Sequence, residues 1–578
     1  MMKKLQAMVF EASRSAAAVR GFRGTIRIIS HYDADGLSSA SILSTALARE
    51  GKAFRLSVIK QLSEDKIREL SKEKNPLMIF SDLGSGHAES IQEHLSGSTV
   101  IILDHHQVKG KAQKSGNLFH INPALFGISD NLSGAGVAYF FAKELNPENA
   151  DLSHLAVVGA LGDSQAGSIE GSWGLAGANK EIIKDAKKAG RLSVDQGLRL
   201  WGRRTRSIHK ALEYCTDPFI PGVSGSESGS VQMLNELSIP LRGEKGWRTL
   251  SDLTQEEQKR LATAIIRERI GANHENPHEI FGEVYELPGH PEEFMDAHEF
   301  ATILNACGKL GKPDVGISMC MLAPQAFLDA RSILASYRKD VGKALRWLNG
   351  NSRAIRPGRG CTCIFGGSMI SEHIISNVTS MLSKSGFVPE DRPVIAFADA
   401  DDGMVKVSAR AHDSLVEGGL SMEALLSAAA SRLGGEGGGH KGAAGATIPK
   451  GAEEEFILQI EEMLETQGLL EPGKAVNNIN INMPQQEDTP EGRRPEASEK
   501  VPSINDEVDY GTADSQRGEN GSEASGDAFR HTAAFKPAAG EEACPGDKAP
   551  AATAAERSGL KKMEGQGLVR YLGAKDVQ

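Results

Sequence analysis

The chain has 578 residues, more than a single hydrophobic core accommodates, and its length predicts three or four domains. Hydrophobic residues make up 40% of the sequence, which is enough for sizeable cores. The net charge of −11 argues against a uniformly basic nucleic-acid-binding surface, although one local basic groove would suffice for binding. No apolar run has the length of a membrane span and the start lacks a signal-peptide core, so we expect a cytoplasmic protein without a membrane partner.

The first predicted strand, over residues 25–30, is followed by a turn rich in acids. This turn reads His31-Tyr-Asp33-Ala-Asp35-Gly36, and a helix is predicted over 37–50. One acidic side chain is sufficient to cap the start of a helix. Two acids and a histidine within five residues exceed that need, so the turn favours a cation-binding site over a cap.

Two further predicted strands end in residues of the same kind. After a strand over 54–59 and a polar helix over 64–74, an apolar strand over 77–81 ends at Asp82. The next strand, over 99–103, ends at Asp104-His105-His106. Apolar runs of this length are typical of buried parallel strands, whose carboxyl ends line the ligand-binding crevice of an open α/β sheet.

The next helix begins at Ser133-Gly-Ala-Gly-Val-Ala138 and is predicted to end at Glu144. Its amino terminus could hold an anion, or its glycines could simply permit close packing. An apolar segment over 154–161 then ends at Gly162-Asp163. We expect this segment, like the three before it, to deliver its acid to the crevice.

The crevice would therefore collect the acids and one imidazole that follow these four segments, namely Asp33, Asp35, Asp82, His105 and Asp163. So many buried carboxylates repel one another unless cations neutralise them. Oxygen ligands with an imidazole favour Mn²⁺, or Mg²⁺ with lower preference. Two such ions sharing a carboxylate are the usual arrangement for hydrolysis of phosphate esters.

The chain beyond residue 192 is less regular. Its densest basic run is Trp201-Gly-Arg203-Arg204-Thr-Arg206-Ser-Ile-His209-Lys210, which is either a solvated face or a phosphate contact. A small helical module is predicted over 231–270, with a Thr254-x-x-Glu257 capping box. Four histidines in the loop-rich segment after it are either surface groups or a zinc site: His274, His278, His290 and His298.

A second α/β domain is predicted in the last structured part of the chain. Connecting helices, strands and one further helix are predicted over 296–310, 323–349, 362–365, 393–398, 405–410 and 422–433. A glycine run, Gly437-Gly438-Gly439-His440-Lys-Gly-Ala-Ala-Gly445, follows. We expect a loop whose backbone N–H groups, with His440 and Arg410, contact a substrate phosphate.

The tail has a different composition. Residues 485–555 are rich in Glu, Pro, Gly, Ser and Ala, which is typical of disorder. Residues 559–577 regain apolar and basic side chains and are either a docking peptide or an idle end.

The motifs resemble those of one family. Asp33-x-Asp35-Gly, Ser81-Asp82, Asp104-His-His and Gly162-Asp163, in this order, resemble the four motifs of the DHH phosphoesterases. The glycine run around His440 resembles the signature of the associated DHHA1 domain. The resemblance covers roughly residues 25 to 450, and Asn122-Pro123 with the Gly134 run is similar to the archaeal RecJ-like single-strand nucleases.

This resemblance implies a role for each residue. Asp82 would bridge both ions, Asp35, His105 and Asp163 would complete one metal site, and Asp33 would hold the other. His106 would face the scissile phosphate, and Asp104 would support the imidazoles. Family members place a histidine four residues before the first motif Asp, where this chain has Ile29, so His31 is the nearest candidate. The implied substrate contacts are Arg410, Gly438, Gly439 and His440.

The predicted architecture is an α/β protein: a parallel-sheet DHH catalytic domain (1–200), an insertion (201–300), connecting helices with a smaller mixed α/β DHHA1 domain (301–470) and a mostly disordered tail (471–578). The resemblance implies a two-metal exonuclease that releases nucleoside monophosphates from single-stranded DNA or RNA, in DNA repair or replication. Alternatives are a phosphoesterase for short oligonucleotides, cyclic dinucleotides or nucleoside bisphosphates, and a replisome scaffold. Replisome proteins such as the GINS complex are possible partners.

Overall fold

The computed structural model describes residues 2–469 with the exception of 111–116, 129–131, 170–171, 216–217, 245, 273, 275, 385–387 and 401–402. The predicted disordered stretch 485–555 and the apolar-basic segment 559–577 lie outside the described residues. Within the described part of the chain, no helix is both long and apolar enough to cross a membrane.

The N-terminal part of the chain is an α/β domain with a five-stranded, fully parallel sheet in the order β2-β1-β3-β4-β5. Its strands are β1 (Ile26–His31), β2 (Phe54–Ile59), β3 (Leu77–Ser81), β4 (Thr99–Leu103) and β5 (Leu118–Ile121). Its helices are α1 (Met2–Gly21), α2 (Ala34–Arg49), α3 (Glu64–Lys72), α4 (Ala88–His94), α5 (Gly134–Leu145), α6 (Ser153–Gly162) and α7 (Asn179–Lys188). The strand order reverses beside β1, as in other open α/β sheets.

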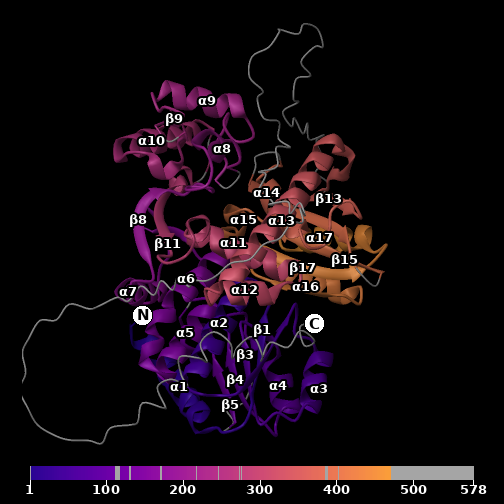
Figure 1. Ribbon diagram of the computed structural model, residues 1–578. Coiled ribbons are helices and arrows are strands. Elements are labelled where there is room, and N and C mark those ends of the chain that lie inside the picture. Colours follow the sequence, from indigo (N-terminus) through magenta and orange to yellow (C-terminus); the bar gives the residue numbers. More distant parts are fainter. Residues whose placement is uncertain are drawn as a thin grey trace, which may run out of the picture. The chain divides into compact units, whose positions relative to one another are not determined.

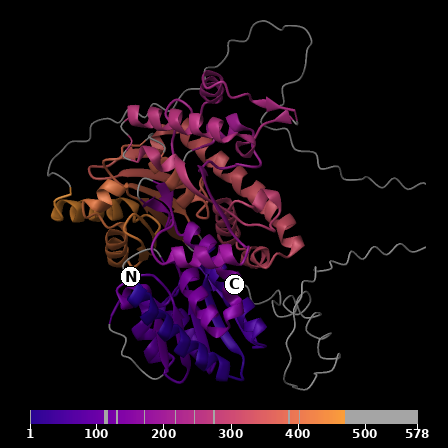
Figure 2. The ribbon, with the colours of Figure 1, turned by 90° about the vertical axis from the view of Figure 1, so that its left-hand side faces the viewer.

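Alternate residues of each strand serve two cores, one on each face of the sheet. Ile28 and Ile79 pack with α1, α2, α5 and α6, whereas Ile29 and Phe80 pack with α3 and α4. Figure 1 shows these two helical layers with the sheet between them, and the layer that contains α1 and α5 is turned toward the viewer in Figure 2. Because both faces are covered, the strands are apolar throughout, which is why their positions could be predicted.

The strands predicted over 54–59, 77–81 and 99–103 are confirmed residue for residue. The helix predicted from residue 37 begins at Ala34, because Asp33 caps it. The apolar segment 154–161 brings Asp163 to the crevice as expected, but it does so as part of the helix α6 and not as a fourth strand. This segment is buried on all sides, so its composition does not distinguish a helix from a strand.

A four-stranded sheet, in the order β6-β7-β11-β8, and a small helical module follow. The sheet contains β6 (Gly167–Ile169), β7 (Ser172–Gly174), β8 (Ser193–Leu198) and β11 (Phe281–Glu286). The module contains α8 (Ile208–Glu213), α9 (Glu227–Glu236), β9 (Arg242–Gly243), β10 (Gly246–Trp247) and α10 (Gln255–Gly271). The Thr254–Glu257 capping box at the start of α10 is confirmed. The pairing of β8 with β11 joins residues about 90 positions apart and was not predicted.

Three helices lead to the C-terminal domain: α11 (Ala297–Lys309), α12 (Pro313–Cys320) and α13 (Pro324–Gly350). The strands of that domain are β12 (Ile355–Pro357), β13 (Thr362–Gly367), β14 (Val394–Asp399), β15 (Met404–Arg410), β16 (Glu436–Gly439) and β17 (Ala443–Pro449). Its helices are α14 (Ile375–Lys384), α15 (Asp413–Glu417), α16 (Met422–Arg432) and α17 (Glu453–Thr466). The mixed sheet has the order β12-β13-β14-β15-β17-β16, and only β13 and β14 are parallel among its pairs. This confirms the mixed α/β architecture.

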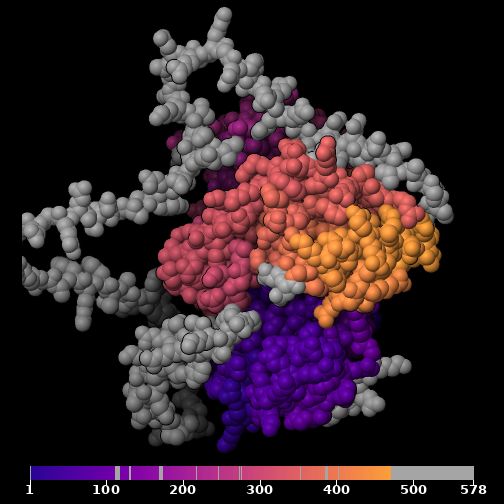
Figure 3. All heavy atoms as spheres, turned by 90° about the vertical axis from the view of Figure 1, so that its right-hand side faces the viewer, coloured from indigo at the N-terminus to yellow at the C-terminus, as the bar shows by residue number. Residues whose placement is uncertain are grey.

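The expectation that the glycine run forms a loop was wrong. Gly438 and Gly439 belong to β16, which pairs with β17, and only the residues from His440 to Gly442 connect the two strands. A Cβ at Gly437 would lie 2.8 Å from the Leu426 carbonyl oxygen, so glycine allows β16 to pass close to α16. Gln61 Nε2 donates to Glu436 Oε2 at 2.8 Å, and in Figure 3 orange atoms of this domain lie against indigo atoms of the N-terminal domain.

Two buried histidines predict a loss of stability in acid. Burial lowers the pKa of His154 and of His290 to about 4, from the ordinary 6.5. The unfolded chain therefore binds more protons between these values, so stability is fully present above pH 6.5 and falls as the pH drops toward 4, by up to about 3 kcal/mol for each histidine. Urea titrations at pH 7.5, 6 and 5 should show this fall.

The His290→Phe variant isolates the contribution of one ring. The His290 ring lies 5.0 Å from that of Phe300 and 6.1 Å from that of Phe327, so a phenyl ring suits its surroundings. We expect His290→Phe to lose less stability than the natural chain between pH 7.5 and 5. Identical losses in the two proteins would contradict the assignment.

Candidate metal centre

The turn between β1 and α2 positions three of the predicted site residues. Asp33 caps α2, where its Oδ1 accepts the Gly36 N–H at 2.9 Å. Its Oδ2 lies 3.0 Å from Nδ1 of His31. A Cβ at position 36 would lie 2.2 Å from the His31 carbonyl oxygen, so the turn requires glycine. The cap uses one oxygen of Asp33 and leaves the other available to a cation.

Asp35 lies in the first turn of α2 and is buried. Its carboxylate accepts the N–H groups of Gly134 at 2.6 Å and of Ala135 at 2.9 Å, at the start of α5. Both predicted alternatives are therefore confirmed: the amino terminus of α5 binds an anion, which belongs to the protein, and a Cβ at Gly134 would lie 2.5 Å from Asp82 Oδ1, so glycine also permits close packing. Burial raises the pKa of Asp35, and the charge of Asp82 raises it further.

Asp82 follows β3 and is the central residue of the cluster. Its φ of +58° is uncommon for a residue other than glycine, and such conformations gather at functional sites. Its side chain is 1% exposed, and neither carboxylate oxygen makes a hydrogen bond to any described residue. Oδ2 lies 3.3 Å from Nδ1 of His31, and Oδ1 lies 3.3 Å from Nε2 of His105. These two imidazole nitrogens compensate the buried carboxylate only in part, so Asp82 is well suited to bind cations.

The Asp104-His105-His106 segment follows β4. The buried Asp104 carboxylate accepts the N–H groups of Ser85 at 2.8 Å, His105 at 2.8 Å and His106 at 3.2 Å, and its Oδ1 lies 2.8 Å from Nδ1 of His106. Burial alone would raise the pKa of Asp104, but the His106 ring and these donors lower it below its usual range. Asp104 thus orients the segment and the His106 ring.

Asp163 reaches the cluster from the carboxyl end of α6. Its Oδ2 lies 3.7 Å from Nδ1 of His105, and its Oδ1 lies 3.4 Å from Nε2 of His440. The His440 ring also stacks on His106, with ring centroids 5.4 Å apart. The structure therefore brings all eight predicted metal and catalytic residues together, and adds His440 of the C-terminal domain to them.

The possible ligand atoms form two sets that share Asp82. One set contains His31, Asp33 and Asp82, and the other contains Asp35, Asp82 and His105, with the atoms of each set within 4.8 Å of one another. Two further sets, which include His106, meet the same distance: His105 with His106 and His440, and Asp82 with Asp104 and His106. Carboxylates and imidazoles suit Mn²⁺ or Mg²⁺. These residues therefore fit two divalent cations on opposite sides of one carboxylate.

A cluster of three half-buried cations, here called the cationic cluster, consists of Lys309, Lys406 and Arg410. Lys309 Nζ donates to Ser376 Oγ at 2.9 Å, and Arg410 Nε donates to Ser380 Oγ at 2.8 Å. Burial and the charge of Arg410 lower the pKa of Lys309 to about 7, although the charge of nearby Asp33 opposes this, and burial lowers the pKa of Arg410 to about 10.

Among the described residues, no ion pair joins these three groups to a carboxylate, although the charge of Asp33 acts on Lys309 and that of Glu372 acts on Lys406. Half-buried cations without a paired carboxylate are suited to an anionic ligand. Arg410 was predicted as a substrate contact, whereas Lys309 and Lys406 were not. They are single lysines far apart in sequence, on α11 and β15, and no local motif marks them.

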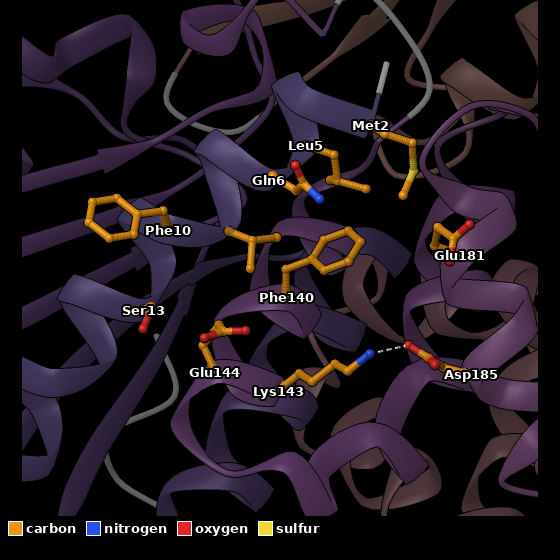
Figure 4. Close-up of a pocket in the computed structure, with 11 residues that line it drawn as sticks. Met2, Leu5, Gln6, Phe10, Ser13, Phe140, Lys143, Glu144, Glu181 and Asp185 are labelled. Atoms are coloured by element: carbon orange, nitrogen blue, oxygen red, sulfur yellow. Dashed lines mark hydrogen bonds and ion pairs between the residues drawn. The ribbon is translucent and has the colours of Figure 1, made fainter.

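A separate groove of about 400 Å³ lies between α1, α5 and α7 and is shown in Figure 4. Its lining includes Leu5, Phe10 and Phe140, together with Lys143, whose Nζ lies 2.6 Å from Asp185 Oδ2. None of the predicted site residues lines this groove, so we assign it no part in the chemistry.

Three family models match the chain in sequence order. They are described as the DHH family, N-terminal domain, over residues 25–162, the DHH-CID domain over residues 200–279 and the DHHA1 domain over residues 367–466. The first match contains Asp82 and the cluster residues from His31 to His106 and ends directly before Asp163, and the third contains Arg410 and His440.

Two curated proteins and, among the solved structures, one example show what the chain is similar to. An uncharacterized protein of Methanocaldococcus jannaschii is 30% identical over 480 residues, which cover 81% of this chain and 99% of that protein. The single-stranded-DNA-specific exonuclease RecJ of Thermus thermophilus is 30% identical over 201 residues, or 32% of this chain and only 28% of RecJ. The crystal structure of CDC45 from Entamoeba histolytica is 11% identical, with a TM-score of 0.53 over 80% of this chain and 98% of that chain, which shows a common fold.

Proposed function

We propose that this chain, which belongs to the RecJ-like DHH family, is a metal-dependent phosphodiesterase that removes nucleotides from one end of single-stranded nucleic acid. The family follows from the three matching domains and from the relative that the chain covers almost completely, and it confirms the resemblance of the sequence motifs. The chain is thus a member of a phosphoesterase family. The nuclease reaction, the polymeric substrate and the identity of the ions are our proposal.

One observation carries this proposal: a buried cluster of acids adjoins the cationic cluster. The Asp82 oxygens accept no hydrogen bond from the described residues, and Asn305 of α11, the helix that carries Lys309, accepts the Ala34 N–H next to Asp33 at 2.8 Å. A phosphodiester is an anion that needs positive groups to hold it and divalent cations to make it reactive. The two neighbouring clusters therefore support a substrate with two adjacent phosphates, one at the acid cluster and one at the cationic cluster.

When bound, two divalent cations supply a nucleophile from water and offset the charge that develops at phosphorus. Asp82 would hold both ions, with His31 and Asp33 on one side and Asp35, His105 and Asp163 on the other. Asp104 would keep His106 oriented through the 2.8 Å contact at Nδ1, so that Nε2 of His106 donates to a phosphate oxygen. The cationic cluster would hold a second phosphate.

His440 supports cleavage at an end of the strand. Its position next to Asp163 and His106 means that a bound phosphate would lie between residues of the N-terminal and C-terminal domains. The similarity to RecJ, named as specific for single-stranded DNA, supports a single strand as substrate. A replisome partner such as the GINS complex stays a prediction from the family.

The test is hydrolysis, with Mn²⁺ or Mg²⁺, of single strands of DNA and RNA that carry a label at either end. Stepwise release of mononucleotides from 30-residue strands is the expected result and would reveal the direction and the preferred sugar. Cleavage of only dinucleotides or nucleoside bisphosphates would overturn the polymeric substrate. No turnover, with metal binding demonstrated, would overturn the enzymatic proposal and favour a scaffold.

The Lys309→Met variant tests the cationic cluster. We expect KM for single strands to rise at least about 10-fold, because a hydrogen bond to a charged group contributes about 1.5–3 kcal/mol. Stabilisation by Mn²⁺ should be unchanged, since Lys309 is no predicted ligand. Lys312→Met is the matched control, because it removes an exposed lysine three residues further along the chain, directly before α12. Equal KM values for the two variants would rule out the assigned role.

A further inference from the structure

The helical module that contains α8, α9 and α10 exposes two large aromatic side chains. Trp247, in β10, is 51% exposed, and Tyr214, which follows α8, is 47% exposed. They are the only exposed tryptophan and tyrosine in the described part of the chain. Exposed aromatic rings that the fold does not use are typical of binding surfaces.

Each ring is accompanied by a cation. The Arg242 guanidinium lies over the Trp247 ring, 4.5 Å from its centroid, and the Arg206 guanidinium lies 5.2 Å from the centroid of Tyr214. Consecutive residues of α8 join the two pairs, because the His209 ring lies 4.9 Å from Trp247 and Lys210 Nζ lies 5.8 Å from Tyr214. We call these six residues the aromatic strip: Arg206, His209, Lys210, Tyr214, Arg242 and Trp247.

The charges of the aromatic strip are only partly neutralised. Lys210 Nζ lies 2.8 Å from Glu213 and 3.0 Å from Glu227, and Nε2 of His209 lies 3.8 Å from Glu227. Arg206 and Arg242, in contrast, form no ion pair among the described residues, although the charge of Glu299 acts on Arg206. The strip thus presents two aromatic rings, each beside an arginine without a paired carboxylate.

We propose that the aromatic strip binds single-stranded nucleic acid and holds the part of the substrate that is not being cleaved. Bases would stack on Trp247 and Tyr214, and Arg206 and Arg242 would contact the phosphates. Stacking requires unpaired bases, and each aromatic contact of this kind stabilises a strand without reading its sequence. The inference rests on the proposed function for its substrate, and it assigns a role to the basic run that begins at Trp201.

Binding is tested on the full chain with the Asp82→Asn substitution, so that the strand survives. Anisotropy of fluorescein-labelled 30-residue oligothymidylate and oligouridylate should show at least about 10-fold weaker binding when Trp247→Ala and Tyr214→Ala are combined. The pair Arg206→Gln and Arg242→Gln should lower the slope of log affinity against log salt by about 1.4, since each phosphate contact on a single strand contributes about 0.7.

Two controls separate binding from folding. The conservative pair Trp247→Phe and Tyr214→Phe keeps an aromatic ring at each position and should retain binding. Phe10→Ala removes an exposed ring on α1 and should not affect binding. Hydrolysis by chains that keep Asp82 adds a functional measurement. The alanine pair should slow cleavage of 30-residue strands but not of dinucleotides, which are too short to reach a second site.

The outcomes distinguish this inference from the proposed function. Normal strand binding by both the alanine pair and the glutamine pair would overturn the inference and leave a protein partner as the ligand of the strip. Loss of binding in those variants, when the natural chain hydrolyses neither long nor short strands, would support the strip and overturn the nuclease.

Discussion

Replacing Asp82 by Asn lowers metal-dependent hydrolysis by at least about 10³-fold and leaves the fold intact. The substitution keeps the shape of the side chain but removes the charge that both cation sites share. No described backbone group donates to the Asp82 carboxylate, so asparagine can replace it without breaking a backbone hydrogen bond. The charge of Asp82 also raises the pKa of the buried Asp35, so removing it relieves repulsion between carboxylates in the metal-free protein.

Thermal unfolding with and without Mn²⁺ measures both effects. The natural chain should gain stability from the metal, because a ligand that binds only the folded state stabilises it. Asp82→Asn should melt no lower than the natural chain without Mn²⁺ and should gain little when Mn²⁺ is added. Asp195→Asn, an exposed acid on β8, is the control and should behave as the natural chain. Turnover by purified Asp82→Asn would refute the shared-ligand assignment.

Replacing His440 by Ala lowers turnover on single strands by about 10²-fold, while Mn²⁺ still stabilises the protein. His440 is 50% exposed at its side chain, and it lies 3.4 Å from Asp163 and against the His106 ring. It can therefore donate a hydrogen bond to a phosphate that is bound at the cation sites around Asp82. Its loss removes an interaction with the substrate and leaves the sets centred on Asp82 unchanged.

His373→Ala removes another exposed imidazole of the same domain and serves as the comparison. Single-turnover rates and metal-dependent melting should be measured on all three proteins. Equal rates for His440→Ala and the natural chain would exclude His440 from the reaction, whereas loss of Mn²⁺ stabilisation would make it a metal ligand.

Most of the N-terminal domain could be predicted, because its parallel strands are short, apolar and followed by functional residues. Asp82 and Asp104 lie directly after buried strands, so the rule that sites gather at strand carboxyl ends placed them together. The same rule brought Asp163 to the correct place through an incorrect element, since α6 is a helix whose end meets the same crevice.

The parts that could not be predicted depend on contacts between distant residues. Lys309 and Arg410 are 101 positions apart and meet only because α11 packs beside the C-terminal sheet. Glycine is common in loops and therefore favours a loop for the glycine run, but the pairing of β16 with β17 prevails over that local preference. The sequence predicts an anion at the start of α5. Only the three-dimensional structure shows that this anion is the Asp35 carboxylate.

Two helices begin at the acid cluster, and their amino termini bear on whether the protein can fold before it binds metal. Asp33 meets the first turn of α2 and Asp35 meets the first turn of α5, so the partial positive charge at each helix start offsets part of the negative charge. The crowded carboxylates are thus tolerated by the backbone itself. Folding therefore does not require the ions, and the metal-free protein keeps a preformed site that can bind them again.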